Sequence, residues 1–378
     1  MVQARGAWLL AGLLGRGHAG NPIMLPSLGI ADPHAHVWPA DPDTVFVYAT
    51  HDCSPSGRGN CTASRGLGFR MDDWPKQIGV VSGPTARGPF SDPIGKALVP
   101  EGLVPSYSRD PCVFREGDDY YLIWGTFSYY VAKLDGSLAA LAEAPRPVVI
   151  RNQEHRDDKP FVHRANGLYY LSWGCFYAVS NSSVYGPYDY VGSFIDAATL
   201  ENTSFASGGG TADRHGSFFA FHNQTYFACN DRSHGGGSGY RNTIVNYVHY
   251  AANGSIAPLR IDEVGVGAFD VAASPRVEAE NYFSASGAAA KRETAAGFAV
   301  DVGPGAALAY NAVRNVPPGA TLRLVGAGDA VFEVAADGAE IGTCGVGAPC
   351  GPLPAGDVAV LAVAAVRGAG TLDALEII

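Results

Sequence analysis

The sequence predicts an all-β fold, in which a β-propeller is followed by a small β-sandwich. The 378 residues include 48 glycines and 11% aromatic residues, a composition typical of many short strands joined by tight turns. A pattern of two adjacent strands recurs about every 50 residues, as it does in the blades of propellers. Residues 276–378 contain no Trp and are rich in Ala, Val and Gly in alternating stretches, which predicts the sandwich.

The overall composition limits the kinds of partner. A hydrophobic content of 47% is enough for a large core divided between two domains. The net charge is −10 and no run of Lys or Arg occurs, which argues against nucleic acid and leaves a neutral or cationic small molecule or polymer. We expect a monomer that contacts neither nucleic acid nor a membrane.

The N-terminus has the features of an export signal. Arg5 precedes the apolar stretch "GAWLLAGLLG", which is too short to span a membrane, and "GHA" at 17–19 offers small residues for cleavage. We therefore expect a signal peptide at 1–19 and a secreted glycoprotein, although an ordinary buried start to the fold is an alternative. Asn-X-Ser/Thr sequons support export, and they lie at Asn60, Asn181, Asn202, Asn223 and Asn253.

Four of the seven cysteines form two closely spaced pairs. Cys53 and Cys61 enclose one short loop, Cys344 and Cys350 enclose another, and each pair suits a local disulfide in an oxidising compartment. No Cys-X-X-Cys or Cys/His zinc spacing occurs, so we expect no zinc site. The remaining cysteines lie in strand-like runs and are expected to be small buried hydrophobes: Cys112, Cys175 and Cys229.

The recurring pattern is clearest in three segments. They are "RDPCVFREGDDYYLIWGTFSYYVAKL" from Arg109, "DKPFVHRANGLYYLSWGCFYAVSNSS" from Asp158 and "RHGSFFAFHNQTYFACNDRSHG" from Arg214. Each has a polar start, an alternating strand, a turn with Gly or Asn, and an aromatic strand. The segment "ADPHAHVWPADPDTVFVYATHD" from Ala31 fits the same frame.

Polar residues stand at the start of each repeat. In a propeller, the starts of the innermost strands lie at the mouth of one central channel. Asp32, Asp110, Asp158 and His215 occupy such starts, so we expect them to converge. The alternative for any single copy is that the Asp stabilises a turn before the strand.

At these residues the chain resembles glycoside hydrolase family 43, five-bladed propeller enzymes that act on arabinan, xylan and related polysaccharides. The resemblance covers roughly residues 21–268 and depends on "GIADPHAHVW", "RDPCVFREGDDYYLIWG", "DKPFVHRANGLYYLSWG" and "DRHGSFFAFHNQTYFACND" in this order. It implies a five-bladed propeller glycosidase domain at 20–270.

The resemblance also implies a role for each polar start. Asp32 matches the general base and Asp110 the acid that raises the pKa of the proton donor. The donor position, a Glu in most of the family, holds Asp158 here, in "DKP" where "EGP" is usual. His215 matches a central His near a bound water or calcium ion, so calcium is an expected, non-essential ligand.

The chemistry of the residues agrees with this implication. An inverting glycosidase needs one carboxylate that activates water and one carboxyl group that protonates the leaving oxygen, about 6.5–9.5 Å apart. A third carboxylate raises the pKa of the donor by repulsion. Asp is one methylene shorter than Glu, so Glu154 and Asp157 are alternative donors on the same loop. Contact of Lys159 or Arg156 with a donor would lower its pKa.

Five further residues are candidates for substrate binding. The aromatic rings of Trp74 and Phe127 can stack on a sugar face, or they can belong to the core. His51 and Asp52 end the second strand of the first repeat and line the pocket or stabilise a turn. Arg241 follows a Gly-rich loop and is expected near the substrate. Three other tryptophans are expected in the blade core: Trp38, Trp124 and Trp173.

The C-terminal region begins with "RVEAENYFSASG", which resembles the opening of family 6 carbohydrate-binding modules. That resemblance implies a β-sandwich at 276–378, Glu residues that help to hold a structural calcium, and Tyr310 as an aromatic of the binding cleft. A structural appendage without sugar binding is the alternative.

Together these features predict a secreted glycosidase that cleaves arabinose-, xylose- or galactose-containing linkages of an oligo- or polysaccharide with inversion. The principal alternative is a glycan-binding propeller of the same family with impaired catalysis, because Asp158 replaces Glu. A scaffold for protein partners is disfavoured because it has no need of acids at successive strand starts. An enzyme acting on fructosides is disfavoured because the Asn-Asp-Pro-Asn opening of that class is absent.

Overall fold

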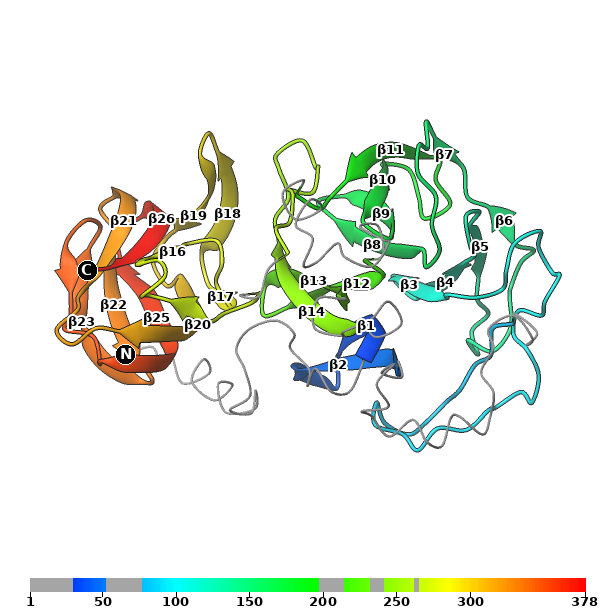
Figure 1. Cartoon of the computed structure of the whole chain (residues 1–378), viewed down its shortest axis with the longest axis horizontal. Helices are drawn as coiled ribbons and strands as arrows, with labels where there is room; N and C mark the ends of the chain where they lie inside the picture. Colours follow the sequence, from blue (N-terminus) through cyan, green and yellow to red (C-terminus); the bar gives the residue numbers. More distant parts are fainter. Residues whose placement is uncertain (1–29, 52–76, 197–213, 232–240, 262–264) are drawn as a thin grey trace.

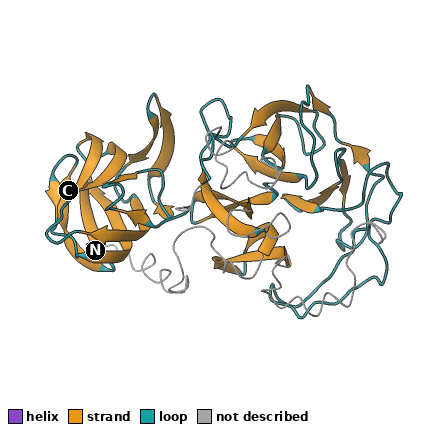
Figure 2. Cartoon of the chain, in the orientation of Figure 1, coloured by secondary structure: helices purple, strands orange, loops and turns teal. Residues whose placement is uncertain are grey.

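The computed structural model describes residues 30–51, 77–196, 214–231, 241–261 and 265–378 (Figure 1). Every regular element among these residues is a β-strand (Figure 2), which confirms the all-β prediction. In the described part of the chain, no helix is long and apolar enough to cross a membrane.

The first part of the chain forms four sheets, each built largely from consecutive antiparallel strands, with β7 pairing parallel to β11 in the third. Figure 1 shows the sheets side by side around a common centre, as blades of a propeller are arranged. The first pairs β1 with β2, and the second has the order β3-β4-β5-β6. The third has the order β7-β11-β10-β9-β8 and the fourth β12-β13-β14. The strands are β1 (Ile30–Trp38), β2 (Asp41–His51), β3 (Cys112–Glu116), β4 (Asp119–Trp124), β5 (Tyr130–Lys133), β6 (Arg146–Pro147), β7 (Ile150–Arg151), β8 (Phe161–Ala165), β9 (Leu168–Trp173), β10 (Phe176–Ser180), β11 (Tyr188–Ser193), β12 (Gly216–Phe221), β13 (Gln224–Asp231) and β14 (Asn242–Val248).

The predicted repeats correspond to these sheets. The three segments that begin at Arg109, Asp158 and Arg214 contribute the hairpins β3–β4, β8–β9 and β12–β13. The described chain between β2 and β3 contains only the isolated bridges Ile78–Val99 and Ser82–Ser91. This stretch separates the first sheet from the second.

The core of the propeller part is aromatic. Trp124 and Trp173 end β4 and β9 and are almost fully buried, as the sequence predicts. The prediction is wrong for Trp38, which is 42% exposed because it ends β1 at the edge of a two-stranded sheet. Cys112, Cys175 and Cys229 are buried, which confirms their prediction as small core residues.

The C-terminal part is a sandwich of two six-stranded sheets. One has the order β15-β20-β25-β22-β23, with β17 paired to β20. The other has the order β18-β19-β26-β21-β24, with β16 paired to β26. The strands are β15 (Phe269–Asp270), β16 (Arg276–Glu278), β17 (Ser284–Ser286), β18 (Ala289–Thr294), β19 (Gly297–Val302), β20 (Ala307–Val316), β21 (Leu322–Gly328), β22 (Val331–Ala336), β23 (Ala339–Gly345), β24 (Pro349–Cys350), β25 (Gly356–Arg367) and β26 (Gly370–Ile377).

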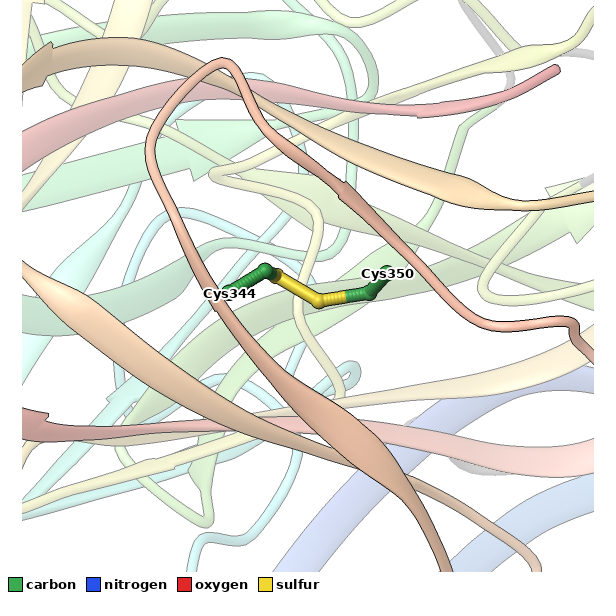
Figure 3. Close-up of a disulfide and its surroundings, with 2 residues drawn as sticks. All are labelled: Cys344 and Cys350. Atoms are coloured by element: carbon green, nitrogen blue, oxygen red, sulfur yellow. A yellow bond between two sulfur atoms is a disulfide. The ribbon is translucent and has the colours of Figure 1, made fainter.

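Two features of the sandwich bear on the sequence predictions. Cys344 and Cys350 form the predicted disulfide between β23 and β24 (Figure 3). Cys53 and Cys61 lie outside the described residues. Tyr310 is not a cleft aromatic: its ring is fully buried in the sandwich core and its hydroxyl donates to the Ala279 carbonyl at 2.8 Å.

Polar contacts join the sandwich to the fourth propeller sheet. The Gln224 side-chain amide donates to the carbonyls of Glu280 and Tyr282 at 3.0 and 3.1 Å. The Lys291 ammonium donates to Gln224 Oε1 at 2.5 Å and lies 3.0 Å from Nδ1 of His249. The two parts of the chain are therefore connected through buried hydrogen bonds as well as through the linking residues.

Candidate active site

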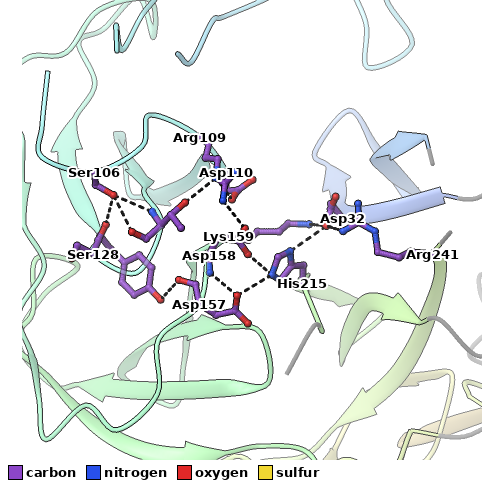
Figure 4. Close-up of polar contacts among 12 residues, drawn as sticks. Asp32, Ser106, Arg109, Asp110, Ser128, Asp157, Asp158, Lys159, His215 and Arg241 are labelled. Atoms are coloured by element: carbon purple, nitrogen blue, oxygen red, sulfur yellow. Dashed lines mark hydrogen bonds and ion pairs between the residues drawn. The ribbon is translucent and has the colours of Figure 1, made fainter. Parts of the chain in front are cut away.

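Local backbone conformation directs three Asp side chains toward the shared centre. Asp32 lies at a register shift of β1 and Asp110 directly precedes Pro111, and both have left-handed backbones with φ of 52° and 54°. Asp tolerates this conformation better than most residues. Asp158 precedes Lys159, which has φ 54°, and Pro160. Figure 4 shows the side chains of all three acids gathered with those of Lys159 and other residues.

Asp32 is held by several donors. Arg241 Nη1 and Asn230 Nδ2 lie 2.9 and 3.0 Å from its Oδ1, and His215 Nδ1 lies 3.3 Å from the same atom. Its backbone N–H donates to Asn230 Oδ1 at 2.6 Å. Burial alone would raise the pKa of Asp32, but the hydrogen bond with His215 and the charges of Lys159 and Arg241 lower it far below its usual range. Asp32 is therefore a carboxylate at any ordinary pH.

Asp158 is bound by two cationic groups. Its Oδ2 accepts from Arg109 Nη2 at 3.2 Å, and its Oδ1 contacts His215 Nε2. Its backbone N–H donates to Asp157 Oδ1 at 2.8 Å. Burial would raise the pKa of Asp158, but the hydrogen bond and charge of His215, together with Arg109, lower it below its usual value.

Asp110 has the opposite electrostatic environment. Asp110 forms an ion pair with Arg109, whose Nε lies 3.7 Å from Oδ2 of Asp110. That oxygen accepts no hydrogen bond from any described residue. Burial, followed by repulsion from Asp158, raises the pKa of Asp110 above its usual value. Of the three acids, Asp110 is the one that the surroundings favour in its protonated form.

His215 connects two of the acids. It directly precedes β12, and its ring nitrogens face Asp32 on one side and Asp157 and Asp158 on the other. Burial would lower the pKa of this imidazole, but hydrogen bonds with Asp157, Asp158 and Asp32 raise it well above its usual value. His215 is therefore an imidazolium that neutralises part of the carboxylate charge.

The next residue fixes the position of His215. A Cβ at Gly216 would meet the Ala228 carbonyl oxygen at 2.1 Å and Cβ of Cys229 at 2.7 Å. Only a glycine allows β12 to approach β13 so closely at this point. The close approach places the preceding imidazole at the centre of the cluster.

Lys159 is a site residue that the sequence reasoning considered only as a disturbance. Its side chain is 3% exposed, and Nζ lies 3.7 Å from Asp32 Oδ1 without a hydrogen-bond partner in the described residues. Burial lowers the pKa of Lys159 to about 8, although the charge of Asp32 acts in the opposite direction. The signal in the sequence is a Lys in the place where the family resemblance has Gly. Arg109 and Asn230 were also missed as site residues, although both lie within the segments that carry the family resemblance.

The other predicted residues have mixed outcomes. Arg241 contacts Asp32 directly, so the structure brings it into the cluster. Phe127 is 53% exposed with φ of 60°, so it is not a core residue, and its N–H donates to the Asp157 carbonyl at 2.9 Å. Glu154 is exposed and takes no part in the ion pairs of the cluster. The side chains of three candidates lie outside the described residues: His51, Asp52 and Trp74.

The cluster contains one group of side chains with the spacing of a metal site. Oxygen atoms of Asp157 and Asp158 and a nitrogen of His215 lie within 4.8 Å of one another. Calcium takes six to eight oxygen ligands. Here hydrogen bonds with these carboxylates favour the protonated imidazole, which has no free nitrogen for a metal ion. The second oxygen of Asp158 is paired with Arg109. These residues do not fit a directly bound calcium ion. In the sandwich, Glu278 of the predicted calcium-binding opening is paired with the Arg276 guanidinium at 2.9 Å.

Comparisons with known proteins point to carbohydrate-active enzymes. No protein-family model matches the chain. The chain is 26% identical to a β-xylosidase of Xylanibacter ruminicola, over 46% of this chain and 82% of that protein. It is 27% identical to an arabinoxylan arabinofuranohydrolase of Bacillus subtilis over 54% of this chain, which spans only 46% of that relative.

Two solved structures match the chain with TM-scores below 0.5. A glycoside hydrolase family 43 arabinoxylan arabinofuranohydrolase from Bacillus subtilis, in complex with cellotetraose, matches with a TM-score of 0.49 and 20% identity. The match covers 94% of this chain and 97% of that one. A family 43 enzyme from Xanthomonas citri in complex with xylose also has a TM-score of 0.49, at 24% identity over 67% of this chain and 98% of that one. The chain is therefore similar to glycosidases, namely a β-xylosidase and an arabinoxylan arabinofuranohydrolase.

Proposed function

We propose that the protein is an inverting glycosidase that cleaves xylosyl or arabinofuranosyl linkages, with galactosyl linkages as a less favoured substrate. The observation that carries the proposal is the meeting of Asp32, Asp110 and Asp158 around His215 and Lys159, from three different sheets (Figure 4). Structural acids rarely gather in this way, because like charges repel unless a site requires them.

The reaction needs a base that is charged and an acid that is protonated. Asp32 suits the base, because Arg241 and Lys159 keep it ionised. The resemblance assigns the proton donor to Asp158 and the modulating role to Asp110. The charge of Asp158 raises the pKa of Asp110, whereas His215 and Arg109 lower the pKa of Asp158.

The substrate class is supported by the surroundings of the cluster. Sugar hydroxyls need both hydrogen-bond donors and acceptors. The guanidinium groups of Arg109 and Arg241 are donors, and the carboxylates that they contact, Asp158 and Asp32, are acceptors. Phe127 lies in the loop after β4, and its backbone N–H donates to the Asp157 carbonyl. Its exposed ring can cover an apolar sugar face. The curated relatives are named for xyloside and arabinoxylan hydrolysis.

The proposal predicts turnover of nitrophenyl β-xyloside or α-arabinofuranoside by the purified chain. We expect Asp32→Ala to lower kcat by about 10²–10⁴-fold, the usual contribution of a general base. Asp189→Ala is the control, because this exposed acid pairs with Arg151, away from the cluster. NMR of the first-formed anomer would test inversion. Absence of turnover on xylosides, arabinofuranosides and galactosides would refute the enzyme proposal.

A second candidate is a glycan-binding propeller with impaired catalysis. The specific observation that favours it is the engagement of both Asp158 oxygens by Arg109 and His215, which leaves this acid poorly suited to donate a proton. Binding of xylo-oligosaccharides by calorimetry, without release of reducing ends, would support this candidate over the first.

We further propose that the protein is secreted as a monomeric glycoprotein and that the sandwich at 276–378 is an accessory domain. The disulfide between Cys344 and Cys350 supports an oxidising compartment. The sequon asparagines Asn181, Asn223 and Asn253 are exposed, as glycan attachment requires. Mass spectrometry of protein secreted by a eukaryotic host would test attachment at these sites.

A further inference from the structure

We propose that Lys159 is the built-in counter-ion of the gathered acids, a positioning residue whose ammonium holds β1 and the start of β8 together at the centre of the propeller part. The inference goes beyond the proposed function, because it concerns how the cluster of acids is stabilised and does not depend on turnover of any glycoside.

The place of Lys159 in the chain puts its charge across the boundary between two sheets. Its backbone follows Asp158 directly and precedes β8, which belongs to the third sheet. Its Nζ lies 3.7 Å from Oδ1 of Asp32, which belongs to β1 of the first sheet. Figure 4 shows this side chain extending from beside Asp158 toward Asp32. One side chain therefore connects two blades through its charge.

The backbone of Lys159 is one that disfavours lysine. Its φ of 54° lies in the left-handed region, which Gly adopts without strain and a residue with a Cβ adopts only against steric resistance. Strain of this kind persists where the surrounding structure compensates for it. Because the backbone does not favour lysine here, the compensation has to come from the side chain.

The surroundings of the ammonium leave charge as its main interaction. The side chain is 3% exposed, and Nζ has no hydrogen-bond partner among the residues that the structure describes. A buried ammonium is ordinarily stabilised by hydrogen bonds together with opposite charge. Nζ is also closed to solvent, so a bound sugar is not its partner. The neighbouring carboxylates are therefore what stabilises it.

Several carboxylates act on this one ammonium. Burial lowers the pKa of Lys159 to about 8, whereas the charges of Asp32, Asp110 and Asp158 all raise it. The side chain is therefore still protonated at neutral pH. By the same attraction, the ammonium stabilises the three acids against their mutual repulsion.

The arginines of the cluster act in a more local way. Arg241 Nη1 lies 2.9 Å from Oδ1 of Asp32, and Arg109 Nη2 lies 3.2 Å from Oδ2 of Asp158. Each guanidinium is thus bound to a particular carboxylate by a directed hydrogen bond. Lys159 makes no such bond within the described part of the chain, so its charge acts on several acids together.

Two substitutions separate the charge of Lys159 from its packing. Lys159→Met removes the charge and keeps most of the volume, and Lys159→Ala removes both. Each keeps a Cβ, so the backbone strain is unchanged. We expect Lys159→Met to lower the melting temperature at pH 7 by about 5–10 °C, since removing one partner of a buried ion pair leaves buried charge uncompensated.

The matched control is an exposed lysine of the same propeller part. Lys133 lies on β5, and its Nζ pairs with Asp119 at 2.8 Å. Lys133→Met should change the melting temperature by less than about 2 °C, because exposed ion pairs contribute little. Equal melting temperatures of Lys159→Met and the wild type would overturn the inference.

An added amine tests directly whether a cation is required. Lys159→Ala is refolded from urea with propylammonium or with 1-propanol, so that neither compound has to enter a closed centre. We expect propylammonium, but not propanol, to restore about half or more of the lost melting temperature with saturation. Neither compound should change the wild type or Lys159→Met, in which the space is filled. Recovery with propanol equal to that with propylammonium, or recovery with neither, would overturn the inference.

A double substitution tests whether the charge acts on the acids. Asp32→Asn removes the nearest carboxylate charge and keeps its shape, and Asn tolerates the left-handed backbone of this residue. In this background, Lys159→Met should lower the melting temperature by less than half as much as it does in the wild type. Additive losses would show that the two side chains act independently, against the inference. If the wild type hydrolyses no glycoside, the proposed function fails, and these melting temperatures still decide the role of Lys159.

Discussion

At the scale of single residues, the cluster depends on how buried charges are paired. Asp32 has three cationic neighbours and is a strong acid, whereas Asp110 has few donors and is a weak one. These opposite changes in pKa show how burial and charge pairing give two side chains of one chemical type different proton affinities. Lys159 belongs to this pairing because its ammonium is buried beside Asp32.

Replacing Lys159 tests this electrostatic pairing. Lys159→Met removes a positive charge 3.7 Å from Asp32 Oδ1, so the pKa of Asp32 should rise toward its usual value. Because a base acts only when it is ionised, an acidic limb of the kcat/KM profile set by Asp32 should lie at higher pH in this variant than in the wild type. Lys159→Arg keeps the charge and should keep the limb. An unchanged limb in Lys159→Met would show that Lys159 does not act through Asp32.

At the scale of elements, strand pairing decides where each polar start points. β12 approaches β13 closely at Gly216, and His215 precedes that contact. The loop before β8 is held by the carbonyl of Asp157, which accepts from Tyr129 Oη and from the Phe127 N–H, both at 2.9 Å. The site is thus positioned by contacts between blades rather than by the acids themselves.

Substituting Gly216 tests the role of the close strand approach. In Gly216→Ala the added Cβ would meet the Ala228 carbonyl oxygen at 2.1 Å, so β12 and β13 must separate. We expect a loss of about 1–3 kcal/mol in the free energy of unfolding, measured in urea, and a fall in kcat from displacement of His215. The control is Gly136→Ala, where an added Cβ meets no atom within 4 Å. Equal stability of the two variants would contradict this account.

At the scale of the whole molecule, two all-β parts are joined across a junction with buried titratable groups. Glu280 is 8% exposed, and burial, assisted by the charge of Glu278, raises its pKa to about 7. Burial lowers the pKa of Lys291 at the same junction to about 8. The junction is therefore sensitive to pH near neutrality.

The pH dependence of stability tests the junction. Because the folded pKa of Glu280 is raised from 4.5 to about 7, its contribution is fully present below pH 4.5 and is lost as pH rises through 7. Glu280→Gln keeps a neutral side chain, so its free energy of unfolding at pH 8 should exceed that of the wild type by about 3 kcal/mol, since a tenfold change in proton affinity corresponds to about 1.4 kcal/mol. At pH 4 the two proteins should differ little. A difference that does not grow between pH 4 and 8, measured in urea, would contradict the prediction.

The sequence by itself determined the all-β class, the strand pairs of the repeats, the sandwich, one disulfide and the gathering of the polar starts. These features follow from local patterns, since alternation, turn residues and short Cys spacing act over a few residues. Only the tertiary structure decided that Trp38 is exposed, that Tyr310 belongs to the core, and that Lys159, Arg109 and Asn230 join the cluster. The opposite pKa shifts of Asp110 and Asp158 were decided at the same level, because burial and charge pairing depend on neighbours far apart in the chain.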